Sequence, residues 1–243
     1  MAEKIKPYKQ SALDKKAQVE QMFDTISGEY DQLNRVISFG ADLRWRKKVV
    51  RYIGQHGGER LLDIATGTGD LAIAFAKKTK AKEIVGLDLS RGMLNQAIAK
   101  VEGRTYAERL RFVKGDSEAL PFDQDYFDAI TVSFGVRNFE HLENGLAEIY
   151  RVLKPGGLLV ILETSVPEKF PFKQGYNFYT KGIMPTIGRW FSKDKSAYRY
   201  LSDSAAAFPY GHAFNNILSE IGFIVQRHKP QTFGVATIYR ATK

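Results

Sequence analysis

From Arg60 onward, short apolar runs alternate with segments of helical periodicity, and this alternation leaves few folds open. The apolar runs are RLLDIA, EIVGLDL, LRFVKGD, FDAITVSF and GLLVILE, and the helical patterns include GDLAIAFAKKTK, RGMLNQAIAKVEG and ENGLAEIYRVLK. Strand-like runs separated by helices predict a parallel sheet that is covered by helices on both faces. The last of these helices is predicted to end at Lys154, before Pro155-Gly156-Gly157.

The C-terminal part departs from this alternation. GHAFNNILSEIGF has a helical pattern, and FIVQRHKP and FGVATIYRAT have the pattern of strands joined by a short turn at Pro230, Gln231 and Thr232. Two strands with so short a connection must pair antiparallel. The sequence therefore predicts an α/β, Rossmann-like fold with a seven-stranded sheet, in which parallel strands are followed by a C-terminal antiparallel hairpin.

Length and composition are typical of one globular unit. The chain has 243 residues, of which 44% are hydrophobic and 26% charged. We predict a flexible N-terminal arm at residues 1–18 and a single domain at 19–243. Within that domain we expect a helical lid at 19–56 and a helical insertion at 166–210. No apolar run approaches the roughly 20 residues of a membrane span, and the N-terminus lacks the apolar core of a signal peptide, so we expect a cytoplasmic protein.

The ionisable residues limit the kinds of site to expect. The chain has no cysteine and only four scattered histidines, so we expect no metal. The formal net charge of +9 favours an anionic partner, which could be nucleic acid, a phospholipid surface or an acidic ligand.

A glycine-containing turn follows the first predicted strand. The stretch LLDIATGTGDLA, residues 61–72, places Gly67-Thr68-Gly69 after a strand that ends near Asp63. In an open α/β sheet, ligands bind at the carboxyl ends of the strands, and glycines let a ligand approach the backbone closely. The near match to G-x-G-x-x-G is weak by itself, because dinucleotide-binding proteins use a similar turn.

Three acidic positions favour S-adenosylmethionine over a dinucleotide. Asp63 would repel a pyrophosphate but suits ammonium and sulfonium groups, directly or through water. Asp88 ends the second predicted strand and can accept hydrogen bonds from both ribose hydroxyls, although NAD sites share this feature. Asp116 and Ser117 follow the third predicted strand, where an acid can accept the adenine amino group. Alternatively, Asp63 caps the next turn and Asp116 is an ordinary loop residue.

The same stretches resemble a known enzyme family. LLDIATGTGD, VGLDLS, GDSEALPF and LKPGGLLVI are similar to successive motifs of class I S-adenosylmethionine-dependent methyltransferases. FDTISGEYDQLNRVISFGADLRWR (23–46) and FDAITVSFGVRNF (127–139) are similar to narrower motifs of the ubiquinone/menaquinone biosynthesis C-methyltransferase family. The resemblance runs from about residue 18 to the C-terminus. It implies methylation of a ring carbon of a polyprenylated quinol, with S-adenosyl-L-methionine as the methyl donor and no metal.

The resemblance also implies donor contacts by Thr68, Asp88, the Asp116-Ser117 pair and Ser133. Together with the strand-tip argument, the expected donor-binding residues are Asp63, Gly67, Thr68, Gly69, Asp88, Asp116, Ser117 and Ser133. The Ser133 hydroxyl is expected to meet the amino-acid end of the donor; alternatively it caps the end of the fourth strand. Thr66 stands where many relatives have a smaller residue, and it fits only if its side chain points away from the donor.

Three residues are candidates for catalysis. A quinol carbon becomes nucleophilic when the adjacent hydroxyl loses its proton, so the protein must stabilise a phenolate. Arg137 stays protonated and could stabilise this charge or orient a water molecule; alternatively it forms a salt bridge with Glu140 or Glu163. Asn138 could hold the second ring oxygen, and Tyr30 could bond the quinol or the donor carboxylate, or simply pack in the lid.

The insertion is rich in aromatic and basic residues. Its eleven aromatics are Phe170, Phe172, Tyr176, Phe178, Tyr179, Trp190, Phe191, Tyr198, Tyr200, Phe208 and Tyr210. Its cations are Lys169, Lys173, Lys181, Arg189, Lys193, Lys195 and Arg199, against the three acids Glu168, Asp194 and Asp203. This mixture suits an anionic membrane surface or a groove for a polyprenyl tail. It is also compatible with stacking on single-stranded RNA, or with a lid that has a solvated basic face.

Among the quinols of this family we expect demethylmenaquinol as the substrate, as in a demethylmenaquinone methyltransferase, because a short chain without a targeting extension suits a bacterium. The equivalent benzoquinol of the ubiquinone pathway, or both quinols, stays open. An RNA methyltransferase and a non-enzymatic donor-binding sensor are more remote alternatives. We expect peripheral association with the inner face of the cytoplasmic membrane and no nucleic-acid partner, and a homodimer is compatible with the resemblance.

Overall fold

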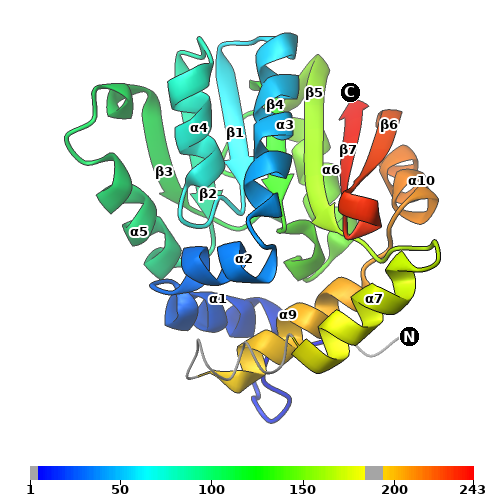
Figure 1. Ribbon diagram of the computed structural model, residues 1–243. Coiled ribbons are helices and arrows are strands. Elements are labelled where there is room, and N and C mark those ends of the chain that lie inside the picture. The colour runs from blue at the N-terminus through cyan, green and yellow to red at the C-terminus, as the bar shows by residue number, and fades with distance from the viewer. Residues whose placement is uncertain (1–4, 184–193) are drawn as a thin grey trace.

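A mixed sheet forms the centre of the molecule (Figure 1). The computed structural model describes residues 5–183 and 194–243. Seven strands lie in the order β3-β2-β1-β4-β5-β7-β6. Their bounds are β1 Arg60–Ile64, β2 Glu83–Asp88, β3 Leu110–Lys114, β4 Phe127–Ser133, β5 Leu153–Thr164, β6 Ile224–Gln231 and β7 Ala236–Thr242. Strands β1 to β5 pair in parallel, and β7 pairs antiparallel with both β5 and β6. The predicted fold is confirmed.

Helices cover both faces of this sheet. On one face, α3 (Ala41–His56) and α4 (Asp70–Lys78) pack on the strands through a cluster that includes Val49 and Phe75. On the other face, α6 (Leu142–Val152) and α10 (His212–Ile221) contribute Ile149 and Phe214 to the larger core. The helix α5 (Arg91–Val101) contacts β2 and β3, and the short helix η1 (Thr105–Arg109) leads into β3.

A helical layer lies below the carboxyl ends of the parallel strands in Figure 1. Its described elements are α1 (Lys15–Ile26), α2 (Tyr30–Ile37), α7 (Phe172–Phe178), the π-helix η3 (Tyr179–Ile183) and α9 (Lys195–Ala207). A third apolar cluster holds α1, α2, α5 and α9 together, with Met22, Leu33, Met93 and Tyr200 at its centre. The expected lid and insertion therefore lie side by side, although more than 100 residues separate them in the sequence.

The first helix begins earlier than the sequence predicted. Helix α1 starts at Lys15, and the Asp14 carboxylate caps it by accepting a hydrogen bond from the Ala17 N–H at 2.7 Å. Within the predicted arm, Ile5 and Tyr8 pack against the third cluster. The Tyr8 hydroxyl donates to Asp194 at 2.5 Å. Residues 5–18 are thus attached to the helical layer, whereas residues 1–4 lie outside the described part of the chain.

Two turns differ from the prediction. Helix α6 ends at Val152 rather than Lys154, and Pro155-Gly156-Gly157 lies inside β5 as an irregularity in its pairing with β4. Pro230 and Gln231 belong to β6, and the hairpin turns at η4, Thr232–Gly234. Because β6 is the outer strand of the sheet, a proline there interrupts no further ladder.

Within the described ranges, no helix combines the length and the apolar character needed to cross a bilayer.

Candidate functional site

A cavity lies where the strands β1, β2 and β4 end against the helical layer. The empty space in it and at its mouth, open solvent included, is about 720 Å³. They include the strand ends, the loop after β3 and the inner side of α1. Among the lining residues are Lys16, Phe23, Tyr30, Gly67, Asp88, Gly115, Asp116, Ser117, Ser133, Phe134 and Asn138. We call this space the donor cavity.

The glycine turn closes one side of the donor cavity. Gly67 and Gly69 have φ angles of 58° and 79°, in the left-handed region that favours glycine. A Cβ atom on Gly69 would lie 2.9 Å from the Ala97 Cβ and 3.1 Å from the Phe112 ring, so a side chain does not fit there. Gly67 lines the cavity, whereas Gly69 lies behind it and begins α4.

Asp88 is the buried carboxylate of the donor cavity. One oxygen accepts from the Gly67 N–H at 2.7 Å, and the other accepts from the Ser90 N–H at 2.9 Å. Burial raises the pKa of Asp88 to about 6, although these backbone N–H groups act in the opposite direction. The carboxylate is therefore fixed in orientation at the end of β2, and each of its oxygens has capacity for a further donor.

Asp63 and Thr66 face each other rather than the cavity. The Thr66 hydroxyl donates to one Asp63 oxygen and the Thr131 hydroxyl to the other, both at 2.6 Å. Burial raises the pKa of Asp63 to about 6. Neither Asp63 nor Thr66 is among the residues that line the cavity. Asp63 thus stabilises the glycine turn, which is the alternative role that the sequence left open for it. The Thr66 side chain points away from the donor cavity, the orientation in which a residue of this size fits there.

Thr68 links the turn to the lid. Its hydroxyl donates to Asp31 of α2 at 2.7 Å, and Lys100 of α5 donates to both Thr68, at 2.8 Å, and Asp31, at 2.6 Å. Lys100 also pairs with Asp70 at 3.0 Å. Thr68 does not line the donor cavity, so its predicted direct contact with the donor remains a prediction.

The other predicted donor residues line the cavity. The Asp116 carboxylate accepts from Lys16 of α1 at 3.0 Å and from the Glu118 N–H at 2.9 Å. Ser117 lies beside it. The Ser133 Oγ is buried and has no hydrogen-bond partner among the described residues. A buried hydroxyl without a partner is unusual in a folded protein, and it suits a polar group of a ligand.

A second, larger cavity adjoins the first. Its empty space, measured in the same way with open solvent included, is about 1560 Å³, and we call it the acceptor cavity. Its walls are mostly apolar and come from α2, α3, α7, η3, α9 and the η4 turn. They include Ile37, Phe39, Trp45, Pro171, Phe172, Tyr176, Tyr179, Leu201, Phe233 and Val235. Tyr30 and Phe134 line both cavities, so the two spaces share a wall.

Arg137 lies at the acceptor cavity and is tightly held. In the 3-10 helix η2 (Val136–Asn138), its Nη1 donates to Glu163 at 2.6 Å and to the Phe134 carbonyl at 2.8 Å. Its side chain is 7% exposed and that of Glu163 is fully buried. Burial alone would lower the pKa of Arg137, but the charge and hydrogen bond of Glu163, together with Tyr30 and Tyr200, outweigh burial and raise the pKa. The Nε of Arg137 and the Oε2 of Glu163 have no partner among the described residues.

Asn138 lies on the donor side, and Tyr30 borders both cavities. Asn138 lines the donor cavity; its amide donates to the Phe134 carbonyl at 3.2 Å and its oxygen accepts from the Tyr200 hydroxyl at 3.1 Å. Tyr30 packs edge-on against Phe23 with 5.8 Å between the ring centres. The predicted catalytic group is therefore brought together around the shared wall, with Arg137 on the acceptor side and Asn138 on the donor side.

The comparison with known proteins decides the family. The sequence pattern of the ubiE/COQ5 methyltransferase family matches residues 10–243. The chain belongs to this family.

Relatives in this family are similar along nearly their whole length. The chain is 46% identical over 241 residues to a demethylmenaquinone methyltransferase of Bacteroides fragilis, covering 99% of this chain and 98% of the relative. It is 45% identical to a ubiquinone/menaquinone biosynthesis C-methyltransferase of Geobacter sulfurreducens, covering 95% and 90%. Among solved structures, a SAM-dependent methyltransferase of Thermotoga maritima, described as a possible histamine N-methyltransferase, has a TM-score of 0.64 at 20% identity and covers 92% and 99%. This last likeness concerns the fold.

The donor cavity fits the methyl donor that this family uses. It offers the Asp88 carboxylate at the end of β2, an acid after β3 and the unpartnered Ser133 hydroxyl at the end of β4. In the part of the chain that the structure describes, no group of three or more His, Cys, Asp or Glu residues is arranged to hold a metal ion. The expected independence of metal stays a prediction.

The sequence did not single out several residues that form the site. Phe134 lies in the FDAITVSFGVRNF motif and forms the shared wall, but a buried aromatic there is indistinguishable from a core residue. Lys16, Lys100 and Tyr200 reach the site from other helices, and no local pattern marks them. Glu163, one of the two alternative salt-bridge partners that the sequence offers Arg137, forms the salt bridge. Glu140, the other alternative, lines the donor cavity.

Proposed function

We propose that this protein methylates a ring carbon of a polyprenylated quinol, with S-adenosyl-L-methionine as the donor, and that demethylmenaquinol is converted to menaquinol. The observation that carries the proposal is the pair of adjoining cavities. Both have mostly apolar linings, but the smaller one holds a buried carboxylate at the end of β2 and the unpartnered Ser133 hydroxyl, whereas Arg137 lines the larger one.

On this proposal, the donor cavity holds the methyl donor through its lining residues. Asp88 accepts from the ribose hydroxyls, Asp116 and Ser117 contact the adenine end, and Ser133 contacts the amino-acid end. Gly67 brings the backbone close to the ligand. Asp63, Thr68 and Gly69 contribute indirectly, because they fix the turn through Thr66, Asp31 and the packing against Ala97. The donor supplies an electrophilic methyl group on a sulfonium.

The acceptor cavity holds the quinol. When the acceptor carbon forms its bond to the methyl group, the carbon–sulfur bond of the donor breaks and the ring loses a proton. Arg137 keeps its own proton because the charge of Glu163 raises its pKa, so we assign it the stabilisation of the phenolate. Asn138 and Tyr30 position the ring and the donor at the shared wall. Holding two groups in line contributes at most about 7–11 kcal/mol to lowering the barrier.

The apolar walls favour a prenylated ring over the other candidates. Aromatic and aliphatic side chains around the acceptor cavity suit an isoprenoid tail, whereas an RNA backbone would need cations that face the site. The quinol of the ubiquinone pathway remains the second candidate, because a relative that is 45% identical is named for both pathways.

The proposed setting follows from the lipid solubility of such a substrate. We place the protein at the inner face of the cytoplasmic membrane as a peripheral, not spanning, component. Association into a homodimer and the absence of a nucleic-acid partner stay predictions.

A direct assay tests the proposal. The purified protein is incubated with methyl-labelled S-adenosylmethionine and either demethylmenaquinol or the corresponding benzoquinol, each with a short prenyl chain. We expect label on the ring carbon, with the naphthoquinol the faster substrate. Tight binding of S-adenosylhomocysteine without methylation of either quinol would contradict the proposed substrate class. Faster turnover of the benzoquinol would move the assignment to the ubiquinone pathway.

A further inference from the structure

Large apolar side chains are exposed around the mouth of the acceptor cavity. They are Phe39, Phe170, Phe172, Phe178 and Phe233, and we call them the aromatic rim. Their exposed fractions range from 39% for Phe172 to 79% for Phe39 and Phe170. Phe39, Phe172 and Phe233 line the cavity, and the other two neighbour its lining residues Pro171 and Tyr179. Exposed apolar groups that gather in one place usually mark a contact surface.

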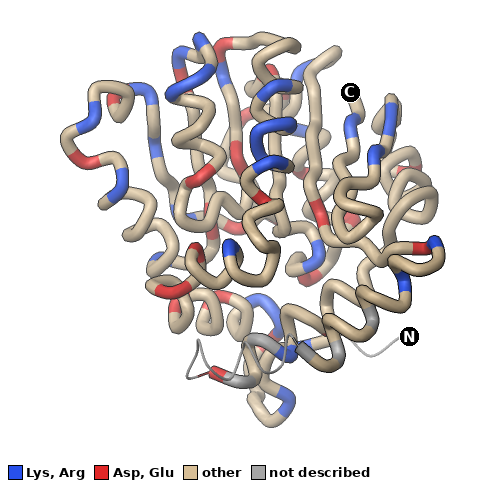
Figure 2. The backbone as a smooth tube through the Cα atoms, in the orientation of Figure 1, with Lys and Arg blue, Asp and Glu red and all other residues tan. Residues whose placement is uncertain are grey.

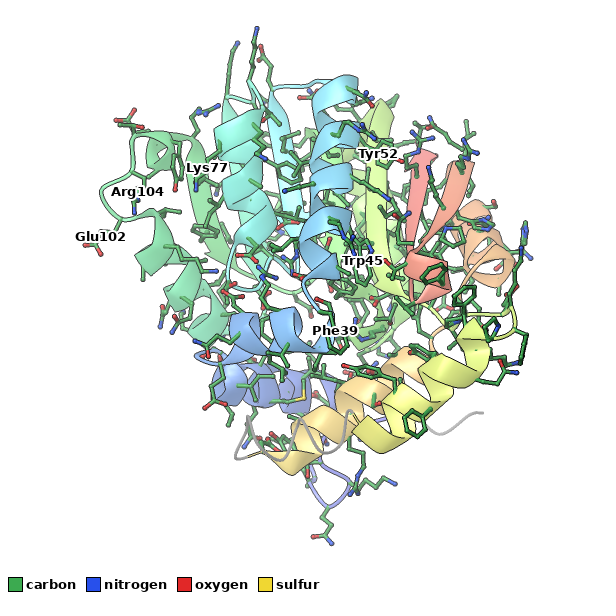
Figure 3. The ribbon with its side chains drawn as sticks, viewed as in Figure 1. Phe39, Trp45, Tyr52, Lys77, Glu102 and Arg104 are labelled. Carbon is green, nitrogen blue, oxygen red and sulfur yellow. The ribbon has the colours of Figure 1, made fainter. Side chains whose placement is uncertain are left out.

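The rim is assembled from three distant segments and is held in position. Phe172 of α7 stacks on Phe233 of the η4 turn, with ring centres 4.0 Å apart. Phe39, in the link between α2 and α3, contacts the Tyr179 ring at 5.8 Å, and the Tyr179 hydroxyl donates to the Ile37 carbonyl at 2.9 Å. Figure 3 labels Phe39 at this link, above α7 and α9.

Two rim residues have a backbone conformation that disfavours them. Phe39 and Phe233 have φ angles of 49° and 59°, which residues with a bulky side chain rarely adopt. In both cases the result is a phenyl ring that is at least 69% exposed. A strained backbone that exposes much of an apolar ring costs stability in the isolated protein. A contact between these rings and another molecule explains the conformation better.

Cations lie in the same segments as the rim. Lys169 in the segment before α7 and Lys173 in α7 are exposed, and helix α3, which begins two residues after Phe39, exposes Arg44 in its first turn. Figure 2 shows Lys and Arg positions along α3. Two exposed acids lie in the same region: Glu168 beside Lys169, and Asp203 beside the lining residue Ser202 of α9. The described cations that neighbour rim residues in the chain thus come from α7, from the segment before it and from the start of α3.

We infer that the aromatic rim and its flanking cations form the face that docks on an anionic lipid bilayer, so that a prenyl tail passes from the lipid into the acceptor cavity without crossing water. This inference rests on the proposed quinol substrate for the role of the tail. Phenyl rings inserted at headgroup depth and cations facing anionic headgroups are the two contributions to interfacial binding. A second copy of the chain docked through the same face would place like charges opposite each other, which disfavours it.

Vesicle flotation tests the rim. The fraction of ligand-free protein that binds is measured on vesicles of phosphatidylcholine that contain about 30% of the anionic lipid phosphatidylglycerol. The double variant Phe170→Ser/Phe178→Ser is expected to lower the ratio of bound to free protein at least ~10-fold, because two phenyl rings no longer leave water. The control Ile224→Ser removes a side chain that is 66% exposed on β6, away from the rim, and should change the ratio less than ~2-fold.

Charge reversal tests the flanking cations. Lys173→Glu, beside the rim residue Phe172 in α7, is expected to weaken binding about tenfold at low salt and much less at high salt, because one headgroup attraction becomes a repulsion. Lys80→Glu is the matched control, since Lys80 is also exposed but follows α4 at the opposite end of the strands. S-adenosylhomocysteine affinity, unchanged in all variants, shows that each is folded.

The outcomes separate this inference from the proposed function. Equal flotation of the rim variant and the control overturns the docking face, whatever the methylation assay gives. If light scattering shows a dimer that the rim variant dissolves, while vesicles bind neither protein, the rim is a subunit interface and the inference is wrong. Methylation of a water-soluble, tail-less quinol without vesicles reports on the proposed function alone. A protein that docks through the rim but methylates no quinol retains the docking face and loses the substrate.

Discussion

The two cavities of this protein are built in different ways. The donor cavity is lined by the ends of consecutive parallel strands, and short hydrogen bonds to Gly67 and Ser90 fix its central carboxylate. The acceptor cavity is lined by α2, α3, α7, α9 and a hairpin turn, which meet mainly through apolar contacts. In the first, backbone geometry places the polar groups. In the second, packing between distant segments shapes the space, and its charged lining residues, Arg137 and Asp42, are each held in buried or partly buried ion pairs.

Substitution of Arg137 should have the largest effect, and it should be confined to the acceptor side. Arg137→Ala is expected to lower kcat about 10²–10³-fold, because a fixed cation near the developing phenolate is lost. S-adenosylhomocysteine affinity, measured by calorimetry, should stay within about threefold, since Arg137 does not line the donor cavity. Unchanged turnover would remove Arg137 from the mechanism.

A milder variant controls for the buried charge that Arg137→Ala leaves on Glu163. Glu163→Gln keeps the size of the side chain and an oxygen that can accept from Arg137, but it removes the attraction that raises the Arg137 pKa. We expect kcat to fall less than in Arg137→Ala, by about tenfold. A thermal melt of both variants separates loss of chemistry from loss of the fold.

Asp88→Asn should affect the donor side instead. The amide can accept fewer hydrogen bonds than the carboxylate, and a charged hydrogen bond contributes about 1.5–3 kcal/mol. We therefore expect S-adenosylhomocysteine to bind about 10- to 100-fold more weakly, while the KM for the quinol changes little. A quinol KM that rises as much as the donor dissociation constant would mean that the two cavities are not separable.

The pH dependence of donor affinity is a second test of Asp88 as the carboxylate that binds the donor. Its pKa is raised to about 6 by burial, so the carboxyl takes up a proton as the pH falls through 6. If the ionised form alone binds, affinity falls about tenfold between pH 7 and pH 5. In Asp88→Asn this dependence should flatten. The raised pKa also means that protonation of Asp88 favours the folded state as the pH falls, so weaker binding at pH 5 would not report unfolding through this group.

A substitution in the link between the lid and the glycine turn should have the smallest effect on stability and donor affinity. Lys100→Met removes the hydrogen bonds from Lys100 to Thr68 and Asp31. The Lys100 side chain is 33% exposed, so we expect a loss of less than about 1 kcal/mol of stability. Donor affinity should fall less than about threefold, as measured by calorimetry, because Thr68 lies behind the cavity wall. A loss as large as that in Asp88→Asn would instead support a direct contact between Thr68 and the donor.

The difference in how the two cavities are built also explains which of their residues could be predicted from the sequence. Asp88, Asp116 and Ser133 follow strands whose apolar runs are evident, and the carboxyl ends of parallel strands meet at one edge. The prediction therefore placed them together without knowledge of any helix. The misplaced hairpin turn has a local cause, since Pro230 suggests a turn but lies in the outer strand, where a missing N–H is tolerated.

The acceptor cavity offered no comparable signal. Phe39, Trp45 and Phe233 come from a link, a helix and a turn that are far apart in the sequence, and each of them alone resembles a core or surface residue. The Trp45 indole donates to the Thr232 hydroxyl at 2.9 Å, a contact that joins α3 to the turn and follows from tertiary packing alone. The aromatic insertion was recognised from its composition, but Trp190, Phe191, Arg189 and Lys193 lie outside the described residues.

The shared wall has a consequence for the order of events. Tyr30 borders both cavities, and its neighbour Asp31 is bound to the glycine turn through Thr68 and Lys100. A ligand that shifts Tyr30 on one side alters the space available on the other. Any such influence is reciprocal, because the free energy by which the donor changes quinol affinity equals the one by which the quinol changes donor affinity. The Tyr30 ring is thus the element through which the binding of one ligand can change the affinity for the other.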